Sequence, residues 1–178
     1  MTVTTRDATS RDQDHLARAL FAAWQWRHPW DEQAFQDHRR SGGPDSYLDD
    51  FGRRAGDAGI VAEEVTDAGP QFAGAAWYRF FAADDHRAGF VAEDVPELVL
   101  AVDHRMRGRG VGSRLLRQLV AVAGQRGIRG LSLHVSNENR AAAGLYRSLG
   151  FELLHRHDDR GAVMFRATVP AEDDVRTC

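Results

Sequence analysis

A glycine-rich stretch between two apolar patterns constrains this chain more than any other feature. It follows the apolar run 98–102, opens an amphipathic segment, and consists of Arg107, Gly108, Arg109, Gly110, Val111, Gly112 and Ser113. This order predicts a strand, a tight turn and a helix. Glycine lets a backbone approach an anion closely, and the first amides of a helix carry unpaired N–H groups with partial positive charge. We therefore expect a site for a phosphorylated small molecule.

Two common phosphate-binding motifs do not fit this stretch. A Walker loop needs a lysine to neutralise phosphate, and this sequence contains none, since arginine supplies all 23 of its Lys and Arg residues. A dinucleotide-binding turn needs the spacing G-x-G-x-x-G and an acidic residue about 20 positions further on. Here the glycines at 108, 110 and 112 alternate, and the next apolar run ends in Val135-Ser136-Asn137 without a carboxylate.

The composition favours one globular domain in a reducing compartment. The 178 residues are 43% hydrophobic with a formal net charge of −3, so a broad basic surface for nucleic acid is not expected. We expect no signal peptide, no membrane span and no internal disulfide, because Cys178 is the single cysteine. The expectation is a cytoplasmic protein with one domain at 1–169, an acidic flexible tail at 170–178, and no nucleic-acid or membrane partner. A homodimer is compatible with the sequence, which leaves the oligomeric state open.

Hydrophobic periodicity predicts both helices and strands. Ser10 and Gln13 match a capping box, after which apolar residues recur at helical spacing to Trp24. Further helices are expected at about 31–40, from 111 towards a stop at Gly127, and from Asn137 or Asn139 to 149. Strands are expected at 3–5, 60–65, 72–81, 97–102, 131–135, 151–154 and 163–165. The strands at 97–102 and 131–135 flank a helix, so we expect them to pair in parallel.

Two blocks of the sequence resemble one enzyme family. Arg107, Gly110 and Gly112 form R-x-x-G-x-G, which resembles the acyl-CoA signature of GNAT-type N-acetyltransferases. Residues 139–151 form N-x-x-A-x-x-L-Y-x-x-L-G-F, which is similar to a second block of that family. The blocks stand in the family's order, and the resemblance says little about residues 25–58. It implies an α/β fold with a mixed, mostly antiparallel sheet, a central splayed parallel strand pair and helices on both faces.

The resemblance implies acetyl-CoA as cosubstrate and no metal. The CoA pyrophosphate would lie on the amides of residues 108–113, and Arg107 and Arg109 would add charged contacts, although a solvated loop cation stays open for Arg109. An amide of the preceding strand would polarise the thioester carbonyl. The pantetheine arm would pair with the backbone of three strand residues, Leu100, Ala101 and Val102.

Two residues of the second block match side-chain roles in the family. Asn139 matches the asparagine that contacts the CoA arm, and a helix N-cap is the alternative, although one residue can do both. Tyr146 matches the general acid that gives a proton to the departing CoA thiolate. The alternative for Tyr146 is a tyrosine that packs in the core.

The general base is open between two residues. Glu97 begins the strand that leads into the glycine-rich stretch, at a family-like position for a carboxylate that acts through water. His134 lies on the neighbouring strand and titrates near neutrality, so it can do the same work. Family members often have glutamate at the position of His134, and this chain departs from them there. Each residue also has a purely structural alternative, a strand end for Glu97 and a hydrogen-bonded interior histidine for His134.

Two further groups of residues are candidates for an acceptor site and a metal site. Trp24, Trp26 and Trp30 lie in the region that walls the acceptor pocket in the family, where aromatic rings can hold an apolar or cationic amine. Ordinary packing against the sheet is the alternative. The segment 155–159, His-Arg-His-Asp-Asp, resembles a metal-ligand cluster, but its place at an expected hairpin end favours an exposed turn.

These residues predict an enzyme that transfers an acetyl group from acetyl-CoA to a primary amine by direct attack in a ternary complex. A non-catalytic acyl-CoA-binding or regulatory module on the same fold is the alternative, because no base stands out. The acceptor is open among small molecules, peptide N-termini and lysine side chains, with a small molecule favoured.

Overall fold

The computed structural model describes residues 2–41, 46–157 and 161–168 of the chain. The expected tail at 170–178 with Cys178, and the acidic pair that follows His157, lie outside the described residues. The predicted helices and strands are confirmed to within a few residues. The α-helices are α1 (Gln13–Trp24), α2 (Glu32–Arg40), α3 (Val111–Gln125) and α4 (Arg140–Ser148). The strands are β1 (Thr2–Asp7), β2 (Ala58–Thr66), β3 (Gly69–Arg79), β4 (Glu97–Val102), β5 (Gly130–Val135), β6 (Glu152–His157) and β7 (Gly161–Ala167).

Within the described residues, seven strands form one mixed sheet in the order β1-β2-β3-β4-β5-β7-β6. The pairs β1–β2, β2–β3, β5–β7 and β6–β7 are antiparallel. β4 and β5 are parallel, with Glu97 opposite Ser132, and α3 lies in their connection, since parallel strands need a long crossover. The predicted mixed, mostly antiparallel sheet with a central parallel pair is confirmed. The splay of that pair stays a prediction.

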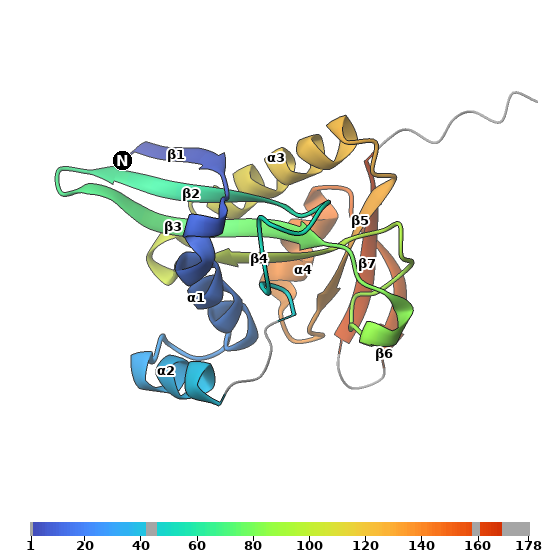
Figure 1. The fold of residues 1–178 in the computed structure, drawn as a ribbon, viewed down its shortest axis with the longest axis horizontal. Helices are drawn as coiled ribbons and strands as arrows, with labels where there is room; N and C mark the ends of the chain where they lie inside the picture. Colours follow the sequence, from blue (N-terminus) through green and yellow to red (C-terminus); the bar gives the residue numbers. More distant parts are fainter. Residues whose placement is uncertain (1, 42–45, 158–160, 169–178) are drawn as a thin grey trace, which may run out of the picture. The chain divides into compact units, whose positions relative to one another are not determined.

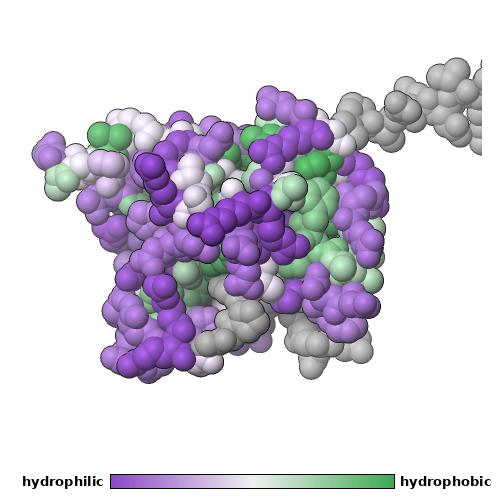
Figure 2. Space-filling model, in the orientation of Figure 1, coloured by the Kyte–Doolittle hydropathy of each residue, from purple (hydrophilic) through white to green (hydrophobic). Residues whose placement is uncertain are grey.

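The chain divides into two compact units. The first contains Met1–Arg79 and Leu98–Leu119, and the second contains Phe80–Glu97 and Val120–Cys178. The described helices include none that is long and apolar enough to cross a membrane. Most of the surface drawn in Figure 2 is hydrophilic.

Helices cover both faces of β2 and β3 in the first unit (Figure 1). The apolar stripe of α1 places Leu16 and Leu20 against Trp77 of β3, and these three side chains are at most 1% exposed. Gly74 lies three residues before Trp77 on β3, so a side chain at this position would project from the other face of the sheet. A Cβ atom there would lie 3.3 Å from Leu115 of α3. Glycine at this position therefore lets α3 lie close to the sheet.

The cap before α1 differs from the predicted one. The sequence predicts Ser10 and Gln13 as the capping pair, but the structure has Thr9 and Asp12, so the prediction was wrong by one residue. Arg6 explains the difference, because its guanidinium donates to both carboxylate oxygens of Asp12 at 2.9 and 2.7 Å. The same oxygen that accepts from the Thr9 amide at 2.8 Å also accepts from Arg6. Hydrogen bonding to Arg6 lowers the pKa of Asp12 to about 2.

The second unit contains α4 together with β5, β7 and β6 (Figure 1). Asn139 caps α4, since its side chain accepts a hydrogen bond from the Ala142 amide at 3.1 Å. The chain then leaves the helix through Gly150, whose φ of 80° suits glycine. The cap and the stop both lie where the sequence predicts them.

A buried ion pair ties the end of β3 to the start of β2 in the first unit. The side chains of Arg79 and Asp57 are 0% and 2% exposed, and Arg79 Nη2 lies 2.5 Å from Asp57 Oδ2. Arg79 Nη1 also donates to the Ser46 carbonyl at 2.7 Å. No local sequence pattern indicates this pair, because the two residues are 22 positions apart.

We expect Asp57→Ala to lower the free energy of unfolding by about 3–5 kcal/mol, because it leaves the Arg79 charge buried without a counterion. Urea denaturation measures this. The matched control is Asp14→Ala, which removes an exposed pair with Arg39, with side chains 63% and 50% exposed. The control should cost about 0–1 kcal/mol. Equal losses in the two variants would contradict a stabilising buried pair.

Candidate functional site

The turn between β4 and α3 has the backbone that its glycines predict. Gly108 and Gly110 have φ values of 72° and 81°, which favour glycine. A Cβ atom at either position would have no neighbour within 4 Å, so this side of the turn is open. Arg107 holds the turn against the strand through Nε, which donates to the Val102 carbonyl at 3.3 Å.

The first amides of α3 follow this turn directly. Arg114 N donates to the Gly110 carbonyl at 3.0 Å, so the amides of residues 111–113 precede the first helical bond there. The first turn of the 15-residue helix carries no acidic side chain, and Arg107 and Arg109 are exposed beside it. Amide groups, the helix dipole and two cations therefore favour an anion at the same place.

The strand before the turn is packed in the first unit. Ala101 is 8% exposed and belongs to the core beneath α1, and Leu100 and Val102 are half-buried. A Cβ atom at Gly74 would lie 2.8 Å from the Ala101 carbonyl, so glycine allows β3 to approach β4 closely here. The role predicted for Leu100–Val102 uses backbone atoms, and this packing holds that backbone in place.

Glu97 and His134 lie together in the second unit. The Glu97 side chain is buried, at 4% exposure for the residue, and Oε1 accepts a hydrogen bond from the Gly89 amide at 3.2 Å. A Cβ atom at Gly89 would lie 2.5 Å from Glu97 Oε1 and 2.8 Å from the His134 amide nitrogen. Gly89 thus fits between the Glu97 carboxylate and the His134 backbone, and any side chain there would displace the carboxylate. Sequence reasoning missed Gly89, because its polar surroundings look like an ordinary loop.

The His134 ring lies over Gly161, where a Cβ atom would come within 2.7 Å of Nε2. The ring centroid is 6.1 Å from that of His157, which in turn is 5.0 Å from that of His155. Within the part of the chain that the structure describes, no three His, Cys, Asp or Glu side chains are placed to hold a metal ion. The three histidine rings therefore lie near one another without a metal-binding arrangement among the described residues.

Tyr146 is a buried phenol on α4. It is 7% exposed and packs edge-on against Phe151, with ring centroids 5.8 Å apart. Burial raises the pKa of Tyr146 to about 12, so the hydroxyl carries its proton at neutral pH and can donate it. The ring of Tyr146 thus packs in the core, and the same residue can still act as an acid through its hydroxyl.

The three tryptophans have different neighbours. Trp30 packs against Phe35 with centroids 5.2 Å apart, and Arg18 lies 5.5 Å from its ring centroid. Trp24 is 49% exposed and lies edge-on to His38 of α2 at 5.3 Å. Trp26 instead has the Arg27 guanidinium over its ring. Trp24 of α1 and Trp30 of the α1–α2 connection are both exposed, and with the rings that they contact on these helices they form an aromatic surface.

Comparisons with known proteins agree with this arrangement. The model of a family described as the acetyltransferase (GNAT) family matches residues 15–151. An uncharacterized protein of Mycobacterium leprae is 51% identical over 55 residues, which are 31% of this chain and 14% of that protein. The ribosomal protein bS18 alanine N-acetyltransferase of Salmonella typhimurium is 39% identical over 74 residues, which are 39% of this chain and 50% of that enzyme. The chain thus spans half or less of the length of these two relatives.

A solved structure shares the fold over nearly the whole chain. The crystal structure of the PaiA N-acetyltransferase of Thermoplasma acidophilum, in complex with coenzyme A, superposes with a TM-score of 0.67. The two chains are 17% identical, and the match covers 94% of this chain and 99% of that one. The likeness to this protein is one of fold.

The raised pKa of Tyr146 predicts a pH dependence of stability. The phenol of Tyr146 loses its proton near pH 10 in the unfolded chain and near pH 12 in the folded chain. The contribution of this group to the free energy of unfolding is therefore complete below pH 10 and is lost as the pH rises from 10 to 12. Two pH units correspond to about 3 kcal/mol. We expect Tyr146→Phe to flatten the decline of the unfolding free energy above pH 10, measured by urea denaturation at pH 9 and at about pH 11.5. An unchanged decline would show that Tyr146 titrates normally.

Proposed function

The chain belongs to the GNAT acetyltransferase family, and from this premise we propose that it transfers an acetyl group from acetyl-CoA to a primary amine by direct attack in a ternary complex. The observation that carries the proposal is the open glycine turn at the start of α3, where backbone amides and two arginines favour an anion. The family match at 15–151 also supports one acetyltransferase domain over residues 1–169.

Acetyl-CoA binds in this proposal through its pyrophosphate on the amides of residues 108–113. Arg107 and Arg109 supply charge-assisted contacts. Asn139 contacts the CoA arm as well as capping α4. The pantetheine arm pairs with the backbone of Leu100–Val102, and an amide near Ala101 stabilises the oxyanion that develops on the thioester carbonyl.

Proton transfers complete the reaction. Glu97, through a water molecule, takes a proton from the acceptor ammonium, and the amine nitrogen then attacks the thioester carbon to give a tetrahedral intermediate. The carbonyl re-forms as the C–S bond breaks, the nitrogen loses its second proton to water, and Tyr146 gives a proton to the departing thiolate. Solvent water then returns a proton to Tyr146 and takes the one held by Glu97. His134 is the alternative base. Glu97 is preferred because its carboxylate is held by the Gly89 amide.

The acceptor is proposed to be a small-molecule amine. The aromatic surface with Trp24 and Trp30 supports an apolar or cationic acceptor, since aromatic faces attract ammonium groups. Trp26, which lies beside Arg27, is the weakest member of the proposed acceptor set. A peptide N-terminus is the competing acceptor, in view of the name of the Salmonella typhimurium relative.

We expect Tyr146→Phe and Glu97→Gln each to lower kcat about 10²–10⁴-fold while the Kd for CoA stays within a few-fold, because each removes a proton-transfer group. CoA release and acetylated product are measured with a panel of amines. Tyr47→Phe and Glu93→Gln are matched controls that should keep full activity. Absence of product from every amine, with CoA still bound, would favour a non-catalytic acyl-CoA-binding module.

We expect CoA, but not NAD, to stabilise the fold, by about 2.7 kcal/mol at a concentration of 100 Kd. Thermal unfolding measures the shift. Gly110→Ala should abolish most of it, because the new Cβ atom enters the open side of the turn. Gly69→Ala is the matched control, since Gly69 also has a positive φ and open surroundings but lies in the β2–β3 hairpin. Equal CoA responses in the two variants would contradict binding at the turn.

A further inference from the structure

The second unit holds a small pocket beside α4, apart from the residues assigned above to proton transfer. Its volume is about 80 Å³, and it is lined by α4, by the end of β5 and the residues that follow, and by β6 and β7. An apolar cavity of about 150 Å³ binds benzene, so this smaller pocket suits a small ligand. Val135 and Ala162 line it, whereas His134, the preceding residue of β5, points to the other face of the sheet.

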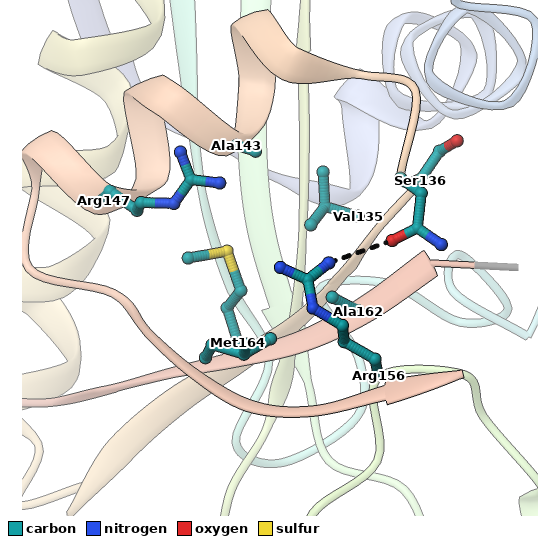
Figure 3. A pocket seen from close by; sticks show the side chains of 9 residues that line it. Val135, Ser136, Ala143, Arg147, Arg156, Ala162 and Met164 are labelled. Atoms are coloured by element: carbon teal, nitrogen blue, oxygen red, sulfur yellow. Dashed lines mark hydrogen bonds between the residues drawn. The ribbon is translucent and has the colours of Figure 1, made fainter. Parts of the chain in front are cut away.

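Two arginines from different elements point into this pocket (Figure 3). Arg147 comes from α4 and Arg156 from β6. Arg156 Nη1 donates to Asn137 Oδ1 at 3.3 Å, which orients its guanidinium at the pocket. Across residues 2–41, 46–157 and 161–168, neither arginine forms an ion pair with a carboxylate. Most of their donors therefore face the pocket or solvent.

Two cations at one pocket favour an anionic ligand. A guanidinium has five N–H donors in a planar fork that matches the two oxygens of a carboxylate. Like charges repel each other, and an anion between them turns this repulsion into two charge-assisted attractions. Two guanidinium groups at one pocket therefore favour a bound oxyanion.

The rest of the lining selects among oxyanions. Val135, Ala143, Ala162 and Met164 contribute apolar surface beside the two guanidinium groups. A phosphate ion would place some of its oxygens against this surface without a hydrogen bond, which is unfavourable. A carboxylate with a short alkyl chain satisfies both parts of the lining.

We propose that this pocket binds a small carboxylate ion through Arg147 and Arg156, with its alkyl chain on the apolar lining. The site is separate from the proposed acetyl transfer and does not depend on it. Asn137 holds one guanidinium in the orientation that the ligand needs.

Two-dimensional NMR of the ¹⁵N-labelled full chain tests the proposal, with butyrate, inorganic phosphate and uncharged butyramide as probes at constant ionic strength. We expect butyrate to shift the amide signals of residues 135–137 and Ala143 in a saturable way. Arg147→Gln and Arg156→Gln should each weaken this binding at least tenfold. Arg117→Gln, which removes an exposed arginine of α3, is the matched control and should bind butyrate normally.

Several outcomes would overturn the proposal. These are no saturable shift with butyrate, equal binding of butyramide, tighter binding of phosphate than of butyrate, or unchanged binding in both pocket variants. Spectra of the variants that otherwise overlay that of the parent chain show that the fold is intact. CoA binding and amine acetylation in the same variants stay unchanged, so a failure of this proposal is distinguishable from a failure of the proposed enzyme activity.

Discussion

The positive φ angles at Gly108 and Gly110 are the constraint on which the candidate cofactor site depends. They turn the chain at the end of the β4–α3 connection, so the first amides of a long helix follow directly on this turn. A side chain with a Cβ atom disfavours this conformation and would also project into the open side of the turn. The same two residues thus fix the backbone and keep the place for an anion clear.

Glycine has a second function around the candidate base. Gly89 donates its amide to Glu97 and leaves no room for a side chain between that carboxylate and the His134 backbone. At Gly161 there is likewise no room for a side chain beside the His134 ring. The positions of Glu97 and His134 therefore depend on two glycines beside them. Tyr146 differs, because burial raises the pKa of its phenol.

The sequence predicted the regular elements and the glycine turn well, because periodicity and turn residues are local signals. The helix cap was misplaced by one residue because Asp12 is bound by Arg6, a partner that a local pattern does not reveal. The Arg79–Asp57 pair and the role of Gly89 were missed for the same reason, since each depends on contacts between distant segments. The three tryptophans are close together in the sequence, and their neighbours in the structure differ. Trp24 and Trp30 contact rings of α1 and α2, whereas Trp26 contacts Arg27.

The central claim is that the turn before α3 binds the pyrophosphate of acetyl-CoA. A crystal structure of the chain grown with CoA tests it most directly. We expect pyrophosphate oxygens within hydrogen-bond distance of the amide nitrogens of residues 108–113. Well-defined CoA density with the pyrophosphate bound elsewhere, and this turn in contact with solvent alone, would contradict it.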